Sequence, residues 1–133
     1  ATTYSYSTLT EMTGESIKLI LEDVADNIFN ADPYYQQGGD MVRVGGMTYT
    51  IEPNALIGSR ITDMRIADTL IDPNKIYKVA GWAPVKEGAS GEPVWDLVAR
   101  WLKHKKIVSS RHPNAPRIIG VDGSLGLTER CGV

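Results

Sequence analysis

The sequence predicts an α+β fold in which two main helices pack against a mixed sheet. Two segments have the apolar spacing of amphipathic helices, one near the N-terminus and one after residue 92, and short strand-like segments lie between them. The chain has 133 residues, 42% of them hydrophobic, which is enough to bury one core. We therefore predict a single domain over residues 1–133, with 122–133 as a flexible tail.

The first helix is predicted over residues 14–29. Its apolar positions recur at intervals of four, three and four: Ile17, Leu21, Val24 and Ile28. Thr13 is a candidate N-cap and Glu15 lies in the first turn, where an acidic side chain favours the helix dipole. Pro33 ends the helix, because proline disfavours helical backbone at the residue before it.

Short strands are predicted in the middle of the chain. Four segments have the residue content of strands: 40–44, 47–51, 60–66 and 75–80. Gly45 and Gly46 fit the two-residue turn of a hairpin between the first two. Pro73, within 71–74, is typical of a turn between the last two.

The second helix is predicted to begin at Pro93. Its apolar stripe comprises Val94, Leu97, Val98, Trp101 and Leu102. If Trp101 is buried, its truncation to alanine removes about 3 to 5 kcal/mol of stability. The basic residues 103–106 are either a solvated helix end or a docking patch. Residues 107–108 and 117–121 are candidate strands.

Composition excludes several classes of function. The net charge of -2 and the pI of about 5.6 give no electrostatic basis for binding nucleic acid or an anionic membrane. No apolar run is long enough to span a bilayer. With His104, His112 and a single cysteine, Cys131, the chain offers no credible metal cluster. We therefore predict that this chain supplies no catalytic residue and no metal ligand.

The stretch 81–96 is the strongest candidate for a binding site. Trp82 precedes a glycine-rich turn that continues into the second helix, and Gly88 and Gly91 permit close approaches that a Cβ would forbid. Two interpretations remain open. The stretch is either a tight connection with a core tryptophan or a surface that contacts a substrate.

Five blocks in order resemble the C-terminal domain of the 5'-nucleotidase family. They read LTEMTGESIK (9–18), YYQQGGDMVRVGGM (34–47), GSRI (58–61), YKVAGW (77–82) and EGASGEPVWD (87–96). The resemblance covers roughly residues 8–121. Within the family, the blocks are most similar to the SoxB thiosulfohydrolases of bacterial sulfur oxidation.

The resemblance implies that this chain is the substrate-recognition part of a larger, periplasmic enzyme. A separate N-terminal metallophosphatase-like domain would carry two manganese ions and all metal ligands, so we expect an upstream half, and the isolated chain to bind no catalytic metal and to be inactive. The implied reaction hydrolyses a cysteine S-thiosulfonate on the SoxYZ carrier and releases sulfate. The alternatives are a nucleotidase-like phosphoesterase and a non-catalytic carrier-binding module.

The resemblance also assigns roles to residues. Nucleotidases of the family stack the base on an aromatic before a Gly-Gly-Asp-Gly loop, and Trp82 matches that aromatic. In this chain residues 86–91 read KEGASG, without the family's Asp, which favours a different substrate. The residues predicted to bind substrate are Trp82, Glu87, Gly88, Gly91, Arg43, Arg60, Gln37 and Gly38.

Three of these assignments have structural alternatives. Arg43 is otherwise a solvent-facing strand residue, and Arg60 otherwise finishes a turn by pairing with Asp63. Residues 36–39 form either an ordinary connection or the rim of a substrate cleft.

Overall fold

The computed structural model describes residues 6–81, 91–109 and 114–123. The chain divides into two compact units, which are described separately. Unit 1 comprises Ala1–Thr13 and Ile76–His112, and unit 2 comprises Gly14–Lys75 and Pro113–Val133. Together they contain two helices and a mixed sheet, so the predicted α+β class is confirmed.

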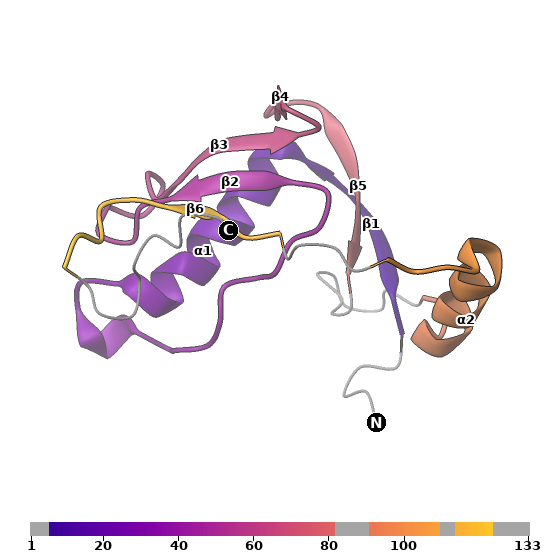
Figure 1. Cartoon of the computed structure of the whole chain (residues 1–133). Coiled ribbons are helices and arrows are strands. Elements are labelled where there is room, and N and C mark those ends of the chain that lie inside the picture. The colour runs from indigo at the N-terminus through magenta and orange to yellow at the C-terminus, as the bar shows by residue number, and fades with distance from the viewer. Residues whose placement is uncertain (1–5, 82–90, 110–113, 124–133) are drawn as a thin grey trace. The chain divides into compact units, whose positions relative to one another are not determined.

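Unit 1 is built on a two-stranded antiparallel ribbon of β1 (Thr8–Thr13) and β5 (Ile76–Gly81) (Figure 1). The register runs from Thr8 opposite Gly81 to Thr13 opposite Ile76. Helix α2 (Val94–Lys105) follows in the same unit, with Pro93 as its N-cap residue. The predicted strand 75–80 is therefore confirmed as β5. Strand β1 was not predicted from the sequence.

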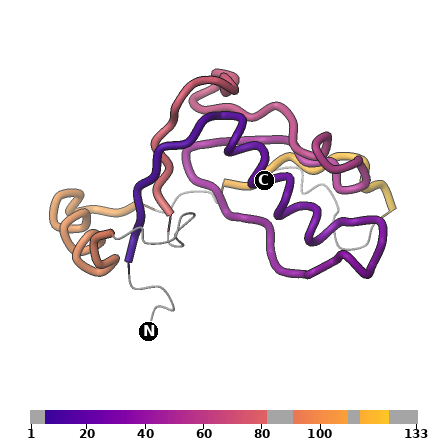
Figure 2. Tube along the Cα trace, turned by 180° about the vertical axis from the view of Figure 1, so that it is seen from behind, coloured from indigo at the N-terminus to yellow at the C-terminus, as the bar shows by residue number. Residues whose placement is uncertain are grey.

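Unit 2 packs helix α1 (Gly14–Phe29) against a four-stranded sheet, as Figure 2 shows from behind. The other elements of the unit are η1 (Pro33–Tyr35), β2 (Thr48–Ile51), β3 (Ile61–Ile66), β4 (Thr69–Leu70) and β6 (Arg117–Ile118). The strand order is β4-β3-β2-β6. Only β2 and β6 are parallel, so the sheet is mixed as predicted.

The hydrophobic core of unit 2 lies between α1 and this sheet. Its buried members are Leu21, Ala25, Met47, Tyr49, Ile51, Ile61 and Met64. Leu21 and Ala25 are four residues apart and lie on the same face of α1, as helical periodicity requires. The bounds of α1 agree with the predicted helix 14–29.

The predicted hairpin at Gly45 and Gly46 is wrong. Residues 40–44 form no strand, and β2 pairs with β3 and β6 instead. The Asn114 side-chain amide donates to the carbonyl oxygens of Val44 at 2.9 Å and Met47 at 2.6 Å. A side chain from the distant C-terminal segment therefore bonds the two carbonyls that flank the glycines, in place of a hairpin ladder. The candidate strand 107–108 is also irregular.

The apolar stripe of α2 is exposed, contrary to the burial that we considered for Trp101. No residue of α2 is buried, and Trp101 is 45% exposed. The large stability loss predicted for Trp101→Ala required a buried side chain, so it is no longer expected. Within the described residues, neither α1 nor α2 combines the length and the hydrophobicity that a membrane span requires.

Candidate functional site

In unit 1, Gly81 and Glu92, which flank residues 82–90, are hydrogen-bonded to the two residues at the start of β1 and just before it. Thr8, which is buried, pairs with Gly81, and its hydroxyl donates to the Gly81 carbonyl at 3.2 Å. One residue earlier, the backbone N–H and the hydroxyl of Ser7 donate to the Glu92 carbonyl at 3.0 and 3.1 Å. Gly81 and Glu92 are therefore attached to two consecutive residues, Thr8 at the start of β1 and Ser7 just before it.

Gly91 is required by the closeness of this attachment. A Cβ built on Gly91 would lie 1.4 Å from the Ser7 carbonyl oxygen, well inside any real atomic contact. The close approach predicted for Gly91 is thus confirmed. Its contact with a substrate stays a prediction.

The Glu92 side chain ties the same anchor to α2. Its carboxylate accepts two hydrogen bonds from the Arg100 guanidinium, one of them 2.8 Å from Nη2 to Oε2. The hydrogen bonds from Arg100 lower the pKa of the Glu92 carboxyl below its ordinary value. This two-point geometry suits a planar guanidinium and sets the orientation of both groups.

Replacing Arg100 by glutamine should raise the pKa of Glu92 toward its ordinary value. The lowered pKa means that the folded protein favours the ionised carboxylate. The ion pair therefore stabilises the fold at a pH above the ordinary pKa of a glutamate, and this stabilisation is lost as the pH falls through the lowered pKa. A carbon-detected NMR titration of the Glu92 carboxyl in both proteins measures the shift. An identical pKa in the variant would contradict the pairing.

Three of the predicted site residues lie outside the described part of the chain. They are Trp82, Glu87 and Gly88. The choice between a core tryptophan and a substrate contact at Trp82 is therefore untested.

Arg60 is accounted for by the fold of unit 2. It is only 4% exposed, and its Nη1 forms an ion pair with Asp26 at 2.6 Å. Its Nε and Nη2 donate to the carbonyl oxygens of Pro53 and Phe29. The alternative pairing of Arg60 with Asp63 is wrong, because Asp63 pairs with Arg65 at 2.7 Å.

The loop after α1 carries the remaining predicted residues. Gln37, Gly38 and Arg43 are all exposed. Gly38 has a φ of 80°, which favours glycine, and its N–H donates to the Asn27 carbonyl at 2.9 Å. The loop is therefore attached to the last turns of α1. Arg43 lies outside any strand, so the strand alternative for Arg43 is wrong.

The structure brings only part of the predicted set together. Gln37, Gly38 and Arg43 come from one loop of unit 2, whereas Gly91 belongs to unit 1. Sequence reasoning missed the anchoring residues Ser7 and Thr8. The run of threonines at 8, 10 and 13 is the only local signal for that strand, since threonine favours β structure.

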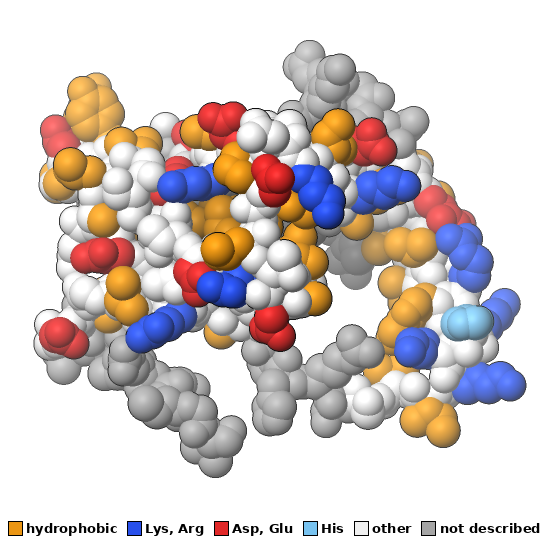
Figure 3. Space-filling model, turned by 90° about the horizontal axis from the view of Figure 1, so that it is seen from above, with side chains coloured by type: hydrophobic (Ala, Val, Ile, Leu, Met, Phe, Trp, Pro, Cys, Tyr) orange, Lys and Arg blue, Asp and Glu red, His pale blue; other side chains and the backbone are white. Residues whose placement is uncertain are grey.

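The charged side chains on the face drawn in Figure 3 include both signs. Acidic and basic groups are interspersed over most of the face in Figure 3. The lysines of residues 103–106 gather around His104 at the end of α2, where basic groups favour the helix dipole. In the part of the chain that the structure describes, no three His, Cys, Asp or Glu residues form a group suited to a metal ion.

Comparisons with known proteins place these features in a family. The model of the 5'-nucleotidase C-terminal domain family matches residues 5–99. The solved structure of the sulfate thiohydrolase SoxB from Thermus thermophilus, in complex with glycerol, is 34% identical to this chain, with a TM-score of 0.73. That similarity covers 89% of this chain and 23% of the relative. No curated protein matches.

Two nucleotidase structures share the fold at lower identity. A putative 5'-nucleotidase from Staphylococcus aureus, in complex with alpha-ketoglutarate, is 15% identical over 86% of this chain and 27% of its own, with a TM-score of 0.58. A 5'-nucleotidase precursor from Thermus thermophilus is 16% identical over 87% of this chain and 25% of its own, with a TM-score of 0.58. The chain thus spans about a quarter of the length of each relative.

Proposed function

Because the chain belongs to the 5'-nucleotidase C-terminal domain family, we propose that it is the substrate-recognition domain of a SoxB-like thiosulfohydrolase. One observation supports this choice within the family. The identity to the sulfate thiohydrolase SoxB is 34%, against 15% and 16% to the two nucleotidases, over similar shares of this chain. Similarity at the lower level supports a common fold rather than a common substrate.

The proposed substrate is a cysteine S-thiosulfonate on the SoxYZ carrier, which the complete periplasmic enzyme hydrolyses with release of sulfate. In the proposal, the two manganese ions are bound by the N-terminal domain of the complete enzyme, as the resemblance implies. Bound there, the metal ions would supply an activated water and stabilise negative charge. This chain would hold the carrier-bound group in place, a role that lowers the entropic part of the barrier.

The segment 82–90 is the proposed contact with the carrier. The residues that flank it, Gly81 and Glu92, are hydrogen-bonded to Thr8 and Ser7. Fixed flanking residues would support binding, because fewer conformations are lost when a partner binds. Trp82 would then present its aromatic face to the carrier, as its place in the family pattern suggests.

In the full-length enzyme, Trp82→Ala should lower kcat/KM on the carrier substrate roughly 5- to 150-fold. This corresponds to a loss of about 1 to 3 kcal/mol of transition-state stabilisation. Manganese content should be unchanged, because the metals belong to the other domain. Steady-state kinetics, metal analysis and a melting curve on the same preparation measure the three quantities.

Trp95→Ala is the matched control, since Trp95 is 54% exposed on α2 and carries no role in this proposal. It should leave kcat/KM within about twofold. Normal kinetics for Trp82→Ala, or a loss fully explained by unfolding, would return Trp82 to the core interpretation.

A nucleotidase-like phosphoesterase is the second candidate, supported by the family match and the shared fold. The two candidates differ in substrate. Full-length enzyme that hydrolyses nucleoside monophosphates and leaves the carrier thiosulfonate intact would favour the nucleotidase. Binding of the carrier without hydrolysis of either substrate would favour a non-catalytic module.

A further inference from the structure

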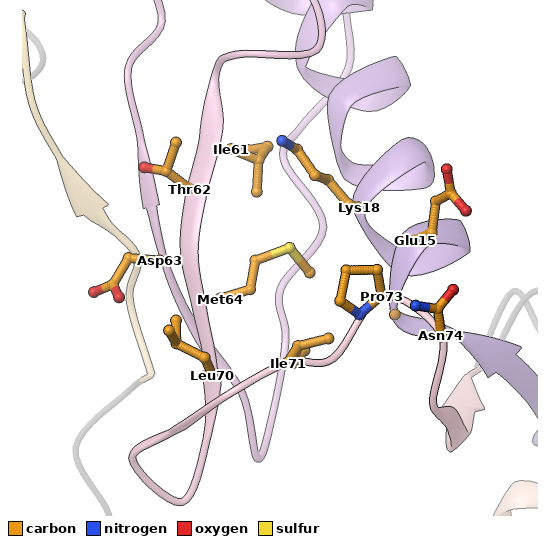
Figure 4. Close-up of a pocket in the computed structure, with 11 residues that line it drawn as sticks. Glu15, Lys18, Ile61, Thr62, Asp63, Met64, Leu70, Ile71, Pro73 and Asn74 are labelled. Atoms are coloured by element: carbon orange, nitrogen blue, oxygen red, sulfur yellow. The ribbon is translucent and has the colours of Figure 1, made fainter.

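A cavity of about 660 Å³ lies in unit 2 between the start of α1, strand β3 and residues 70–74 (Figure 4). Its volume is within the range of small-molecule sites in proteins. Of the predicted substrate residues that the structure describes, none lines it. It is therefore a separate feature from the site proposed above, and the inference below does not depend on that function.

One wall of the cavity is apolar. Ile61 and Met64 of β3 are buried core residues, at 0% and 8% exposure, and they form its floor. Leu70, Ile71 and Pro73 complete the apolar lining, and Leu70 is 57% exposed. An apolar ligand in the cavity would cover this exposed surface, which is favourable in water.

Hydrogen bonds join the start of α1 to the segment 73–75 beside the cavity. The Gly14 N–H donates to the Lys75 carbonyl at 3.1 Å, and the Glu15 N–H donates to the Pro73 carbonyl at 3.0 Å. A Cβ on Gly14 would lie 2.3 Å from the Asp72 carbonyl oxygen, so the helix start and this segment are in close contact. These bonds occupy the first N–H groups of α1, and a ligand anion would have to bind elsewhere.

Lys18 supplies the positive charge in the cavity. Its ammonium group points across the cavity toward β3 and Ile61 in Figure 4. Among the described residues, none of the ion pairs involves Lys18. Asp63 is also among the lining residues, and its carboxylate pairs with Arg65. Lys18 is half-buried, its ammonium points toward Ile61, and a carboxylate would neutralise its charge.

We propose that this cavity binds a small amphipathic molecule with one carboxylate. The carboxylate pairs with Lys18, and the apolar body lies against Met64, Leu70 and Ile71. A single negative charge fits because, among the described residues, Lys18 is the only cation that lines the cavity, while the lining carboxylates Glu15 and Asp63 repel a second one.

Octanoate is the probe, and an NMR titration of the ¹⁵N-labelled 133-residue chain is the measurement. We expect saturable shifts at the amides of Lys18, Met64 and Asn74. Octanamide has the same chain without the charge, and it should bind at least about fivefold more weakly. This comparison uses the wild-type chain, so it does not depend on the folding of any variant.

Two substitutions separate charge from packing. Lys18→Gln should weaken octanoate at least about fivefold, whereas Lys18→Arg should stay within about twofold. Lys105→Gln, on the exposed end of α2, is the control and should change nothing. Unsaturated shifts, shifts centred on the apolar stripe of α2, or equal affinity of octanoate for the wild type and Lys18→Gln would each overturn the proposal.

Discussion

Replacing Arg60 by alanine should lower the free energy of unfolding by about 3 to 5 kcal/mol, because it removes the charged centre of a buried network. The Arg60 side chain is 5% exposed and bonds three separate parts of unit 2: Asp26 at 2.6 Å, Pro53 at 3.2 Å and Phe29 at 3.3 Å. Its loss leaves two carbonyls without their donor and a hole beside α1. Both effects cost stability in a packed interior.

Arg65→Ala is the matched control for this experiment. Like Arg60, Arg65 forms an ion pair with an aspartate: its partner is Asp63, at 2.7 Å. These two side chains are 38% and 53% exposed. Exposed pairs contribute little, so the expected loss is below about 1 kcal/mol. Urea denaturation of both variants measures the difference, and equal losses would show that Arg60 is not the buried centre described above.

The Arg60 effect should also depend on pH in a defined direction. Its hydrogen bond lowers the pKa of Asp26 below the ordinary value. The Arg60–Asp26 pair therefore stabilises the fold at a pH above the ordinary pKa of an aspartate. This contribution is lost as the pH falls through the lowered pKa. The difference between the free energies of unfolding of the wild type and Arg60→Ala should therefore become smaller as the pH is lowered through that pKa.

Helix α1 shows how far local patterns carry a prediction. Apolar spacing predicted its bounds, and Leu21 is buried as expected. The next residue, Glu22, is only 2% exposed, which no periodicity predicts for a carboxylate. Its oxygens accept backbone N–H bonds at 2.8, 3.3 and 2.7 Å from residues 36 to 39 positions away: Gly58, Arg60 and Ile61. Long-range partners of this kind leave no local signal.

The sheet was less predictable than the helix for the same reason. Residues 40–44 have a strand-like composition, but the edge of β2 is filled by β6, from residue 117 onward. Asn114, just before β6, bonds the carbonyls on both sides of the supposed turn. Local sequence spacing does not contain the information that a side chain some 70 residues later, Asn114, bonds this segment in place of a hairpin.

The candidate site was predicted in part. The glycine-rich pattern correctly placed a close backbone approach at Gly91, because only glycine permits it. Its partner, Ser7, bonds Glu92 across 85 residues of sequence and was missed. The assignment to a family came from ordered blocks of sequence, and the family match confirms it.

Gly91→Ala is the second variant with a large expected effect. The new methyl group cannot lie 1.4 Å from the Ser7 carbonyl oxygen, so the two backbones must separate. Separation weakens the two hydrogen bonds from Ser7 to the Glu92 carbonyl, at 3.0 and 3.1 Å. We expect a loss of about 2 to 3 kcal/mol, the usual cost of forcing extra volume into a tight contact.

Gly45→Ala tests whether this loss comes from the contact or from glycine itself. A Cβ on Gly45 meets no atom within 4 Å, and its φ is not in the left-handed region. Alanine at position 45 should therefore be neutral within about 0.5 kcal/mol. Hydrogen exchange adds a local readout, because Gly91→Ala should speed exchange of the Ser7 amide and leave the Ile61 amide protected. Unchanged exchange at Ser7, with a wild-type melting curve, would contradict the close contact between Gly91 and Ser7 and the hydrogen bonds from Ser7 to Glu92.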